Sequence, residues 1–149
     1  MTVEEKLRGL GLVLPLPSVP ADVCRRARRV VNLDYPAGRT PNIGSRPQPE
    51  YADVAGRCIT SEPTKKEAEL SGLNILAALK VEAGSLDKVK GGACRFWAAW
   101  KVLPTSAVGA GVVNDASELF VAFCGEGGLA ARMALGTEGR AGKSARFRK

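Results

Sequence analysis

The sequence has 149 residues, 45% of them apolar and 25% charged, which suits one globular domain and excludes a chain that is disordered throughout. No histidine is present, so a Ser-His-Asp triad, a Cys-His dyad and any zinc site with histidine ligands are excluded within one chain. Lysine and arginine outnumber the acids by 22 to 15, and two patches, 25–29 and 140–149, hold more than the whole excess of +7.

A short N-terminal helix is the first predicted element. Thr2 and Glu5 match a capping box, in which each side chain accepts a hydrogen bond from the other residue's backbone N–H. Gly9 and Gly11 predict that this helix ends early. Residues 12–20 carry three prolines, so they predict an extended arm that lies over a surface.

The middle of the chain predicts strands, a loop and a long helix. Residues 23–35 combine Val, Leu and Tyr with the first arginine patch and predict one or two strands. Residues 36–49 are rich in Pro, Gly, Asn and Ser and predict a loop. A helix is predicted over 61–83, with a broad apolar stripe that is typical of a helix packed on a sheet. The stripe comprises Ala68, Gly72, Ile75 and Leu79, widened by Leu73, Leu76 and Ala77.

The C-terminal half predicts a central strand over 89–102, a turn over 104–111, a second buried helix over 112–123 and a strand over 130–135. The basic tail, 139–149, receives no assignment. Two long helices that each follow strands predict a single α+β domain over the whole chain. We expect a mixed sheet with both long helices on one face.

One arginine has an unusual setting. Between Gly125 and Gly136 a helix ends in glycine, turns, and continues as a strand in which Arg132 lies among small apolar residues. A buried guanidinium without a partner is costly, so Arg132 needs one. Its planar fork suits a carboxylate, either of the protein or of a ligand. A local glutamate or backbone carbonyl groups are the alternative partners.

The cysteines and the apolar runs indicate the cellular compartment in which the protein is expected. None of the four cysteines forms a C-x-x-C pair, so no zinc knuckle or thioredoxin-type motif is present. The longest apolar run, 119–124, is far too short to cross a membrane, and the N-terminal segment does not resemble a signal peptide. We expect a cytoplasmic protein without membrane association.

Several segments occur in a recognisable order and spacing. They are residues 3–12, Asn32 to Pro41, 73–80, 84–90, Asn114 to Leu119, and the Gly-Glu-x-Gly-x-x-Ala-Arg-x-x-x-Gly run over 125–136. Together they resemble the Rid family, the reactive intermediate deaminases of the YjgF-like group, which are also labelled endoribonuclease L-PSP-like. The resemblance runs over most of the chain.

The resemblance implies a chorismate-mutase-like α+β fold and a homotrimer that binds small ligands in clefts between subunits. It implies that Arg132 binds the substrate carboxylate, with Lys101 and Tyr35 as further cleft residues. Active members of the family hydrolyse enamines and imines, such as 2-aminoacrylate and 2-iminopropanoate, to a keto acid and ammonia. They need no metal and no organic cofactor, so we expect none here.

The sequence also departs from the family at positions that line its cleft. Ala37 replaces a serine, residues 99–101 replace a Phe-x-Asn segment, and Ala134 replaces a cysteine. Residues 143–148 replace an acidic C-terminal strand whose glutamate orients water.

These departures leave several interpretations. In the first interpretation the chain is a deaminase that positions water with another acid, and the acids nearest to Arg132 in the sequence are Glu126 and Glu138. In the second it is a non-catalytic ligand-binding or regulatory trimer. Errors in the divergent blocks are a third explanation, which an intact mass would test. RNA binding or cleavage is not favoured, because no aromatic residue lies within the 25–29 patch to stack on bases and no histidine can serve in acid–base catalysis.

Overall fold

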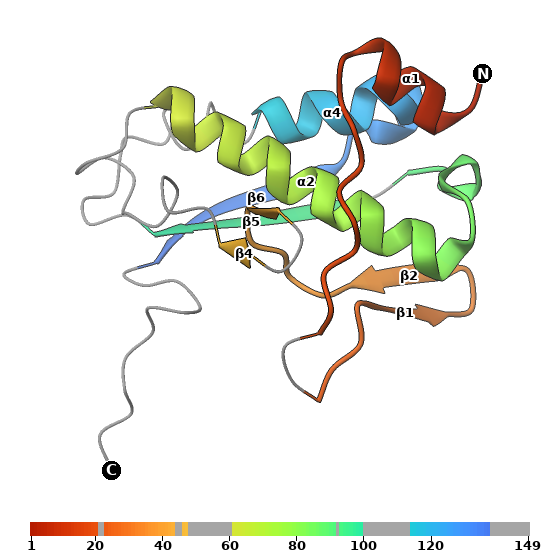
Figure 1. Ribbon diagram of the computed structural model, residues 1–149, viewed down its shortest axis with the longest axis horizontal. Helices are drawn as coiled ribbons and strands as arrows, with labels where there is room; N and C mark the ends of the chain where they lie inside the picture. The colour runs from red at the N-terminus through yellow and green to blue at the C-terminus, as the bar shows by residue number, and fades with distance from the viewer. Residues whose placement is uncertain (21–22, 44–45, 48–60, 92, 100–113, 138–149) are drawn as a thin grey trace.

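A computed structural model describes residues 1–20, 23–43, 46–47, 61–91, 93–99 and 114–137 of the chain (Figure 1). The elements in chain order are α1 (Val3–Gly9), β1 (Ala27–Val30), β2 (Leu33–Pro36), β3 (Asn42–Ile43), β4 (Arg46–Pro47), α2 (Ser61–Ala83), η2 (Leu86–Lys88), β5 (Ala93–Ala99), α4 (Asn114–Cys124), η3 (Gly125–Gly128) and β6 (Ala131–Thr137). The mixture of helices and strands confirms the α+β class.

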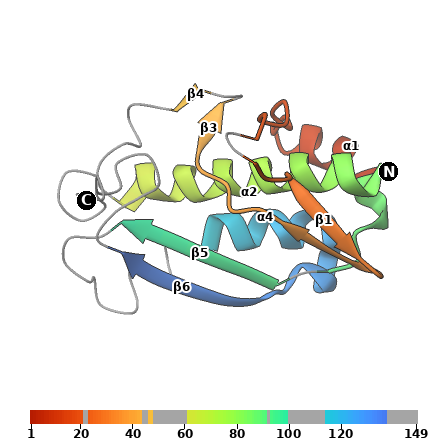
Figure 2. The ribbon, with the colours of Figure 1, turned by 90° about the horizontal axis from the view of Figure 1, so that it is seen from below.

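The strands of the described ranges form three pairs. β1 pairs with β2 and β3 with β4, both antiparallel, whereas β5 and β6 are parallel. The single mixed sheet that we predicted is therefore not seen there, because each strand is hydrogen-bonded to one neighbour. Figures 1 and 2 show α2 and α4 on the same side of the β5–β6 pair, as expected for both long helices.

The core lies where α1, α2 and α4 meet. Its buried residues are Val3, Leu7, Leu73, Leu76, Leu86, Leu119, Phe120 and Phe123. At Gly72 the two long helices approach closely, since a Cβ there would lie 3.2 Å from the Leu119 Cδ2 atom. The apolar stripe of α2 thus packs on helices as well as strands, and its predicted members Ile75 and Leu79 are half-buried at the edge of the core.

The predicted capping box is confirmed at α1. The Thr2 hydroxyl accepts a hydrogen bond from the Glu5 N–H at 3.2 Å, and the Thr2 N–H donates to the Glu5 carboxylate at 2.7 Å. An ion pair of 3.1 Å between Glu4 and Lys80 ties α1 to α2. The Lys6 ammonium donates to a backbone carbonyl of α4 at 3.3 Å. This short helix is therefore held by contacts to both long helices.

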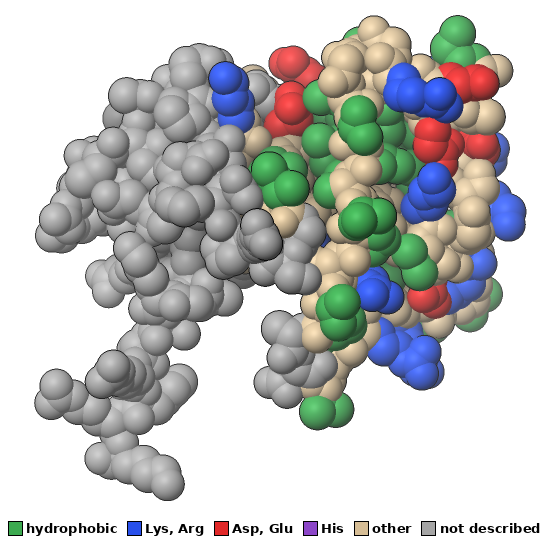
Figure 3. All heavy atoms as spheres, viewed as in Figure 1, with side chains coloured by type: hydrophobic (Ala, Val, Ile, Leu, Met, Phe, Trp, Pro, Cys, Tyr) green, Lys and Arg blue, Asp and Glu red, His purple; other side chains and the backbone are tan. Residues whose placement is uncertain are grey.

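The predicted arm follows α1 and crosses α2 in Figure 1. Leu12 and Leu14 pack against the core. Val13, Leu16 and Val19 on the arm are exposed. Figure 3 shows hydrophobic side chains on this face of the molecule.

Arginines fix the arm to the strands. The Arg26 Nε donates to the Ser18 carbonyl oxygen at 2.8 Å, and the Arg39 guanidinium donates to the Ser18 hydroxyl at 3.1 Å. Burial lowers the pKa of Arg39, and the neighbouring charge of Arg26 lowers it further. Part of the basic excess therefore has a structural role.

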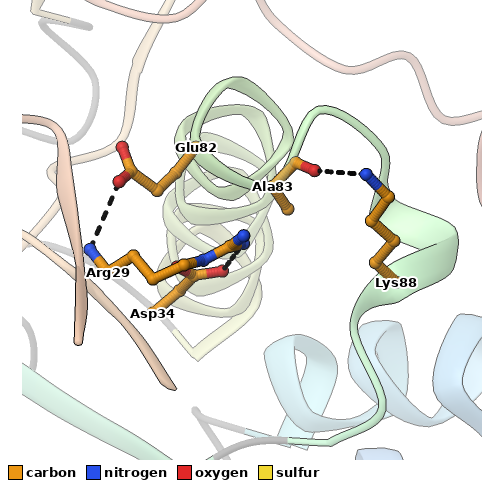
Figure 4. Close-up of polar contacts among 5 residues, drawn as sticks. All are labelled: Arg29, Asp34, Glu82, Ala83 and Lys88. Atoms are coloured by element: carbon orange, nitrogen blue, oxygen red, sulfur yellow. Dashed lines mark hydrogen bonds and ion pairs between the residues drawn. The ribbon is translucent and has the colours of Figure 1, made fainter. Parts of the chain in front are cut away.

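The β1–β2 hairpin is anchored to the C-terminal end of α2 (Figure 4). The Arg29 guanidinium donates twice to the Asp34 carboxylate, at 2.8 and 2.7 Å, and the Arg29 backbone N–H donates to Glu82 at 3.2 Å. The hydrogen bonds from Arg29 hold the pKa of Asp34 below its ordinary value. Nearby, the Lys88 ammonium donates to the Ala83 carbonyl oxygen at 3.2 Å and satisfies the end of the helix.

The predicted loop over 36–49 contains more structure than expected. The two-residue strands β3 and β4 lie within it. Asn74 of α2 is buried and donates from its amide to the carbonyl oxygens of Thr40 and Asn42, at 3.1 and 2.8 Å. A tertiary contact thus orders backbone whose composition favours a loop.

The later elements match their predictions with shifted ends. α4 is described from Asn114, and 112–113 of the predicted helix lie outside the described residues, whereas β6 runs two residues beyond the predicted strand. β5 begins at Ala93 rather than 89, and 100–102 lie outside the described residues. The predicted turn over 104–111 and the basic tail lie outside them as well.

The turn of the β1–β2 hairpin offers a test of stability. Val31 has a φ of 58°, a left-handed conformation that disfavours β-branched residues, and it is 91% exposed. Val31→Asn is expected to stabilise the fold by about 1 kcal/mol and to raise the Tm by about 3 °C in thermal unfolding. The matched substitution Val13→Asn, at an exposed position without positive φ, is expected to leave the Tm unchanged. Equal effects of the two substitutions would show that the turn is not strained.

Candidate functional site

A surface cleft of about 610 Å³ lies between α4, η3 and the start of β6. Four polar side chains line it, those of Asn114, Ser117, Glu118 and Arg132. Apolar side chains, Val121 and Leu129 among them, form the rest of the wall. The cleft is therefore a largely apolar hollow with polar groups that converge from two elements.

The glycine-rich η3 brings β6 back along α4. Gly125 has a φ of 60°, which glycine adopts without strain, and it follows directly on the last residue of α4. A Cβ on Gly128 would clash with the carbonyl oxygen of Phe120, so only glycine permits this close approach to α4. The result is that Arg132, the second residue of β6, lies beside the first turns of α4.

The Arg132 guanidinium is oriented by two side chains of α4. It donates from Nη1 to the Ser117 hydroxyl at 2.8 Å and from Nη2 to the Asn114 side-chain oxygen at 2.7 Å. Both acceptors are neutral side chains, and these two bonds orient the fork. The sequence led us to expect a buried arginine whose fork meets a carboxylate of the protein or of a ligand, with a local glutamate or backbone carbonyl groups as the alternative partners. Instead Arg132 is exposed within the single chain, because its strand runs along the open cleft.

Glu118 is the acid of the cleft that sequence reasoning missed. The expected acids were Glu126, which is exposed on η3 and is not among the lining residues, and Glu138, which lies outside the described residues. A helical signal was present in the sequence, because 114, 117, 118 and 121 follow i, i+3, i+4 and i+7 spacing and so share one face of α4.

Of the other two predicted site residues, the structure describes Tyr35 and places it away from the cleft. Tyr35 lies on β2, is 57% exposed, and is not among the residues that line the cleft. Lys101 lies outside the described residues. Within the ranges that the structure describes, no group of three His, Cys, Asp or Glu side chains could hold a metal ion. No helix there is long and apolar enough to span a bilayer.

Comparisons with known proteins bear on the fold. No protein-family model and no curated protein matches the chain. A solved structure of a protein of unknown function from Agrobacterium tumefaciens is 27% identical, with a TM-score of 0.78 over 94% of this chain and 83% of that one. A "putative endoribonuclease" from Shewanella oneidensis MR-1 is 23% identical, with a TM-score of 0.80 over 93% of this chain and 89% of that one. The chain has a Rid-like fold.

This likeness confirms the mixed α+β architecture that the sequence resemblance implied. It spans most of this chain and of both neighbours, so it concerns the domain as a whole.

Proposed function

We propose that this Rid-like chain binds a small imine or enamine with a carboxylate, such as 2-iminopropanoate, and hydrolyses it to a keto acid and ammonia. The observation that carries the proposal is the guanidinium of Arg132, which two neutral side chains hold at the edge of a cleft. A planar fork in this setting matches the two oxygens of a carboxylate.

The proposed chemistry needs little from the protein. The carbon of an imine is already electrophilic, so water adds to it, the π electrons move to nitrogen, and a proton follows from the water. The proton of the new hydroxyl group then passes to the nitrogen, the C–N bond breaks, ammonia leaves, and the carbonyl group of the keto acid forms. Fixing the carboxylate on Arg132 holds the reacting carbon in one place, which lowers the entropic part of the barrier. A chain without histidine can perform such a reaction.

We further propose a homotrimer with the cleft between subunits, in which Tyr35 and Lys101 contribute to the cleft. In support, the face of the β1–β2 hairpin that bears Val30, Leu33 and Tyr35 is 52–57% exposed in the single chain. Such a half-exposed apolar face suits burial against another subunit.

Two other functions remain as alternatives, a non-catalytic ligand-binding or regulatory trimer and an RNA-binding, endoribonuclease-like protein. The name of the Shewanella oneidensis neighbour favours the second alternative. Against it, Arg26 and Arg29 of the first basic patch make intramolecular hydrogen bonds. RNA binding that weakens steeply as salt rises would support that function.

Ligand binding tests the carboxylate site directly. Pyruvate, the stable product of 2-iminopropanoate, is titrated calorimetrically into the unmodified protein and into Arg132→Ala. Loss of a charge-assisted, forked hydrogen bond is expected to weaken binding about 10- to 150-fold. Arg8→Ala, which removes an exposed arginine of α1 outside the cleft, is expected to leave the affinity unchanged. Equal affinities for pyruvate in all three proteins would overturn the assignment.

A further inference from the structure

We propose that Glu118 makes the cleft selective for ligands that carry a positively charged nitrogen beside the carboxylate. The ligands favoured would be protonated imino acids and amino acids, and the ligands disfavoured would be keto acids. The inference rests on the proposed function, because it takes Arg132 as the group that binds the carboxylate.

The charges that line the cleft carry this inference. Among the described residues lining it, Arg132 is the cation and Glu118 is the anion. Glu118 and Arg132 line the same cleft, and Glu118 follows on α4 directly after Ser117, whose hydroxyl accepts a hydrogen bond from Arg132 at 2.8 Å. The remaining lining residues are apolar, small or uncharged. The cleft therefore offers a small ligand one positive and one negative group.

A protonated α-imino acid complements such a pair. Its carboxylate and its nitrogen are attached to neighbouring carbons, so a ligand held by Arg132 at one end presents N–H donors at the other. A carboxylate accepts a charge-assisted hydrogen bond from such a nitrogen. A keto acid presents a carbonyl oxygen in the same place, which gives Glu118 no proton and repels it. Glu118 thus distinguishes substrate from product.

The same preference assists the reaction. A protonated imine is the more electrophilic form, because the π electrons move to a nitrogen that is already positive as water adds to carbon. Glu118 stabilises that form by its negative charge. When the C–N bond breaks, the nitrogen leaves as ammonium, and the keto acid that remains has no N–H to donate to Glu118. Release of the product is then favoured over retention.

Two stable ligands that share one carbon skeleton test the inference. Alanine carries an ammonium and a carboxylate, and pyruvate carries the carboxylate alone. The unmodified protein is expected to bind alanine about 5- to 10-fold more tightly than pyruvate in calorimetric titration. This preference is modest because solvent screens the interaction between the partly exposed charges. Glu118→Gln removes the negative charge and is expected to reduce the ratio of the two affinities to about one. Glu126→Gln removes an exposed acid of η3 outside the cleft and is expected to preserve the ratio.

The outcomes separate this inference from the proposed function. Arg132→Ala is expected to weaken the binding of both ligands. If Arg132→Ala does so but Glu118→Gln keeps the preference for alanine, or if the unmodified protein has no preference, the inference is overturned and the carboxylate site stands. If Arg132→Ala binds pyruvate normally, or the folded protein binds neither ligand, the proposed function fails and the inference fails with it. Circular dichroism of each variant verifies that it is folded.

Discussion

Replacing Arg132 with alanine is expected to lower kcat/KM for the hydrolysis of 2-iminopropanoate by about 10³-fold, because the substrate loses both affinity and orientation. The guanidinium is held by Asn114 and Ser117 before any ligand arrives, so the ligand does not have to order it. Without the fork, the imine can rotate within an open cleft of about 610 Å³. The measurement is the initial rate of ammonia release from imine generated in the assay.

A charge-preserving variant separates charge from geometry. Arg132→Lys keeps the positive charge but presents a single ammonium in place of a planar fork, so its rate is expected to lie between those of alanine and arginine. Arg8→Ala, at an exposed position of α1, provides the control for a general loss of positive charge. A lysine variant as active as the unmodified protein would contradict a role for the forked geometry.

Leu76→Ala is expected to cost about 3 kcal/mol of folding free energy, since a fully buried leucine leaves a cavity that its neighbours fill only in part. Leu76 is 0% exposed and belongs to the core between α1, α2 and α4. Urea unfolding measures the loss as a lower midpoint with an unchanged slope. All variants are compared at one protein concentration, because subunit association would make stability depend on it.

The same helix supplies the control for this core substitution. Val81 is 53% exposed on α2, and Val81→Ala is expected to change stability by less than about 0.5 kcal/mol. If both substitutions cost the same, the side chain of Leu76 would not lie in the core.

Local signals in the sequence explain which parts of the fold could be predicted. The capping box at Thr2, the long apolar helix of 61–83 and the glycines after α4 act through neighbours in the chain, and the structure confirms all three. Strand pairing depends on residues far apart in sequence, so the parallel pairing of β5 with β6 was not foreseen. The hydrogen bonds from Asn74 to the backbone of Thr40 and Asn42 were missed for the same reason.

The residues of the site show the same contrast between local signals and contacts that depend on the fold. The fork of Arg132 and the apolar residues around it identify a carboxylate-binding residue from sequence alone. Its hydrogen bonds to Asn114 and Ser117 needed the structure, because η3 has to fold before β6 meets α4. Glu118 was missed because the predicted acids, Glu126 and Glu138, are the ones nearest to Arg132 in the sequence, whereas Glu118 reaches the cleft from the preceding helix. The roles of Tyr35 and Lys101 remain predictions.

Ammonia release by the unmodified protein tests the central claim most directly. 2-Iminopropanoate is generated in the assay, and its hydrolysis is followed with and without the purified chain at neutral pH. The account predicts saturable acceleration over the spontaneous rate, with one pyruvate formed for each ammonia. A folded protein that leaves the rate at that of the blank would contradict the assignment of the Arg132 cleft as a deaminase site.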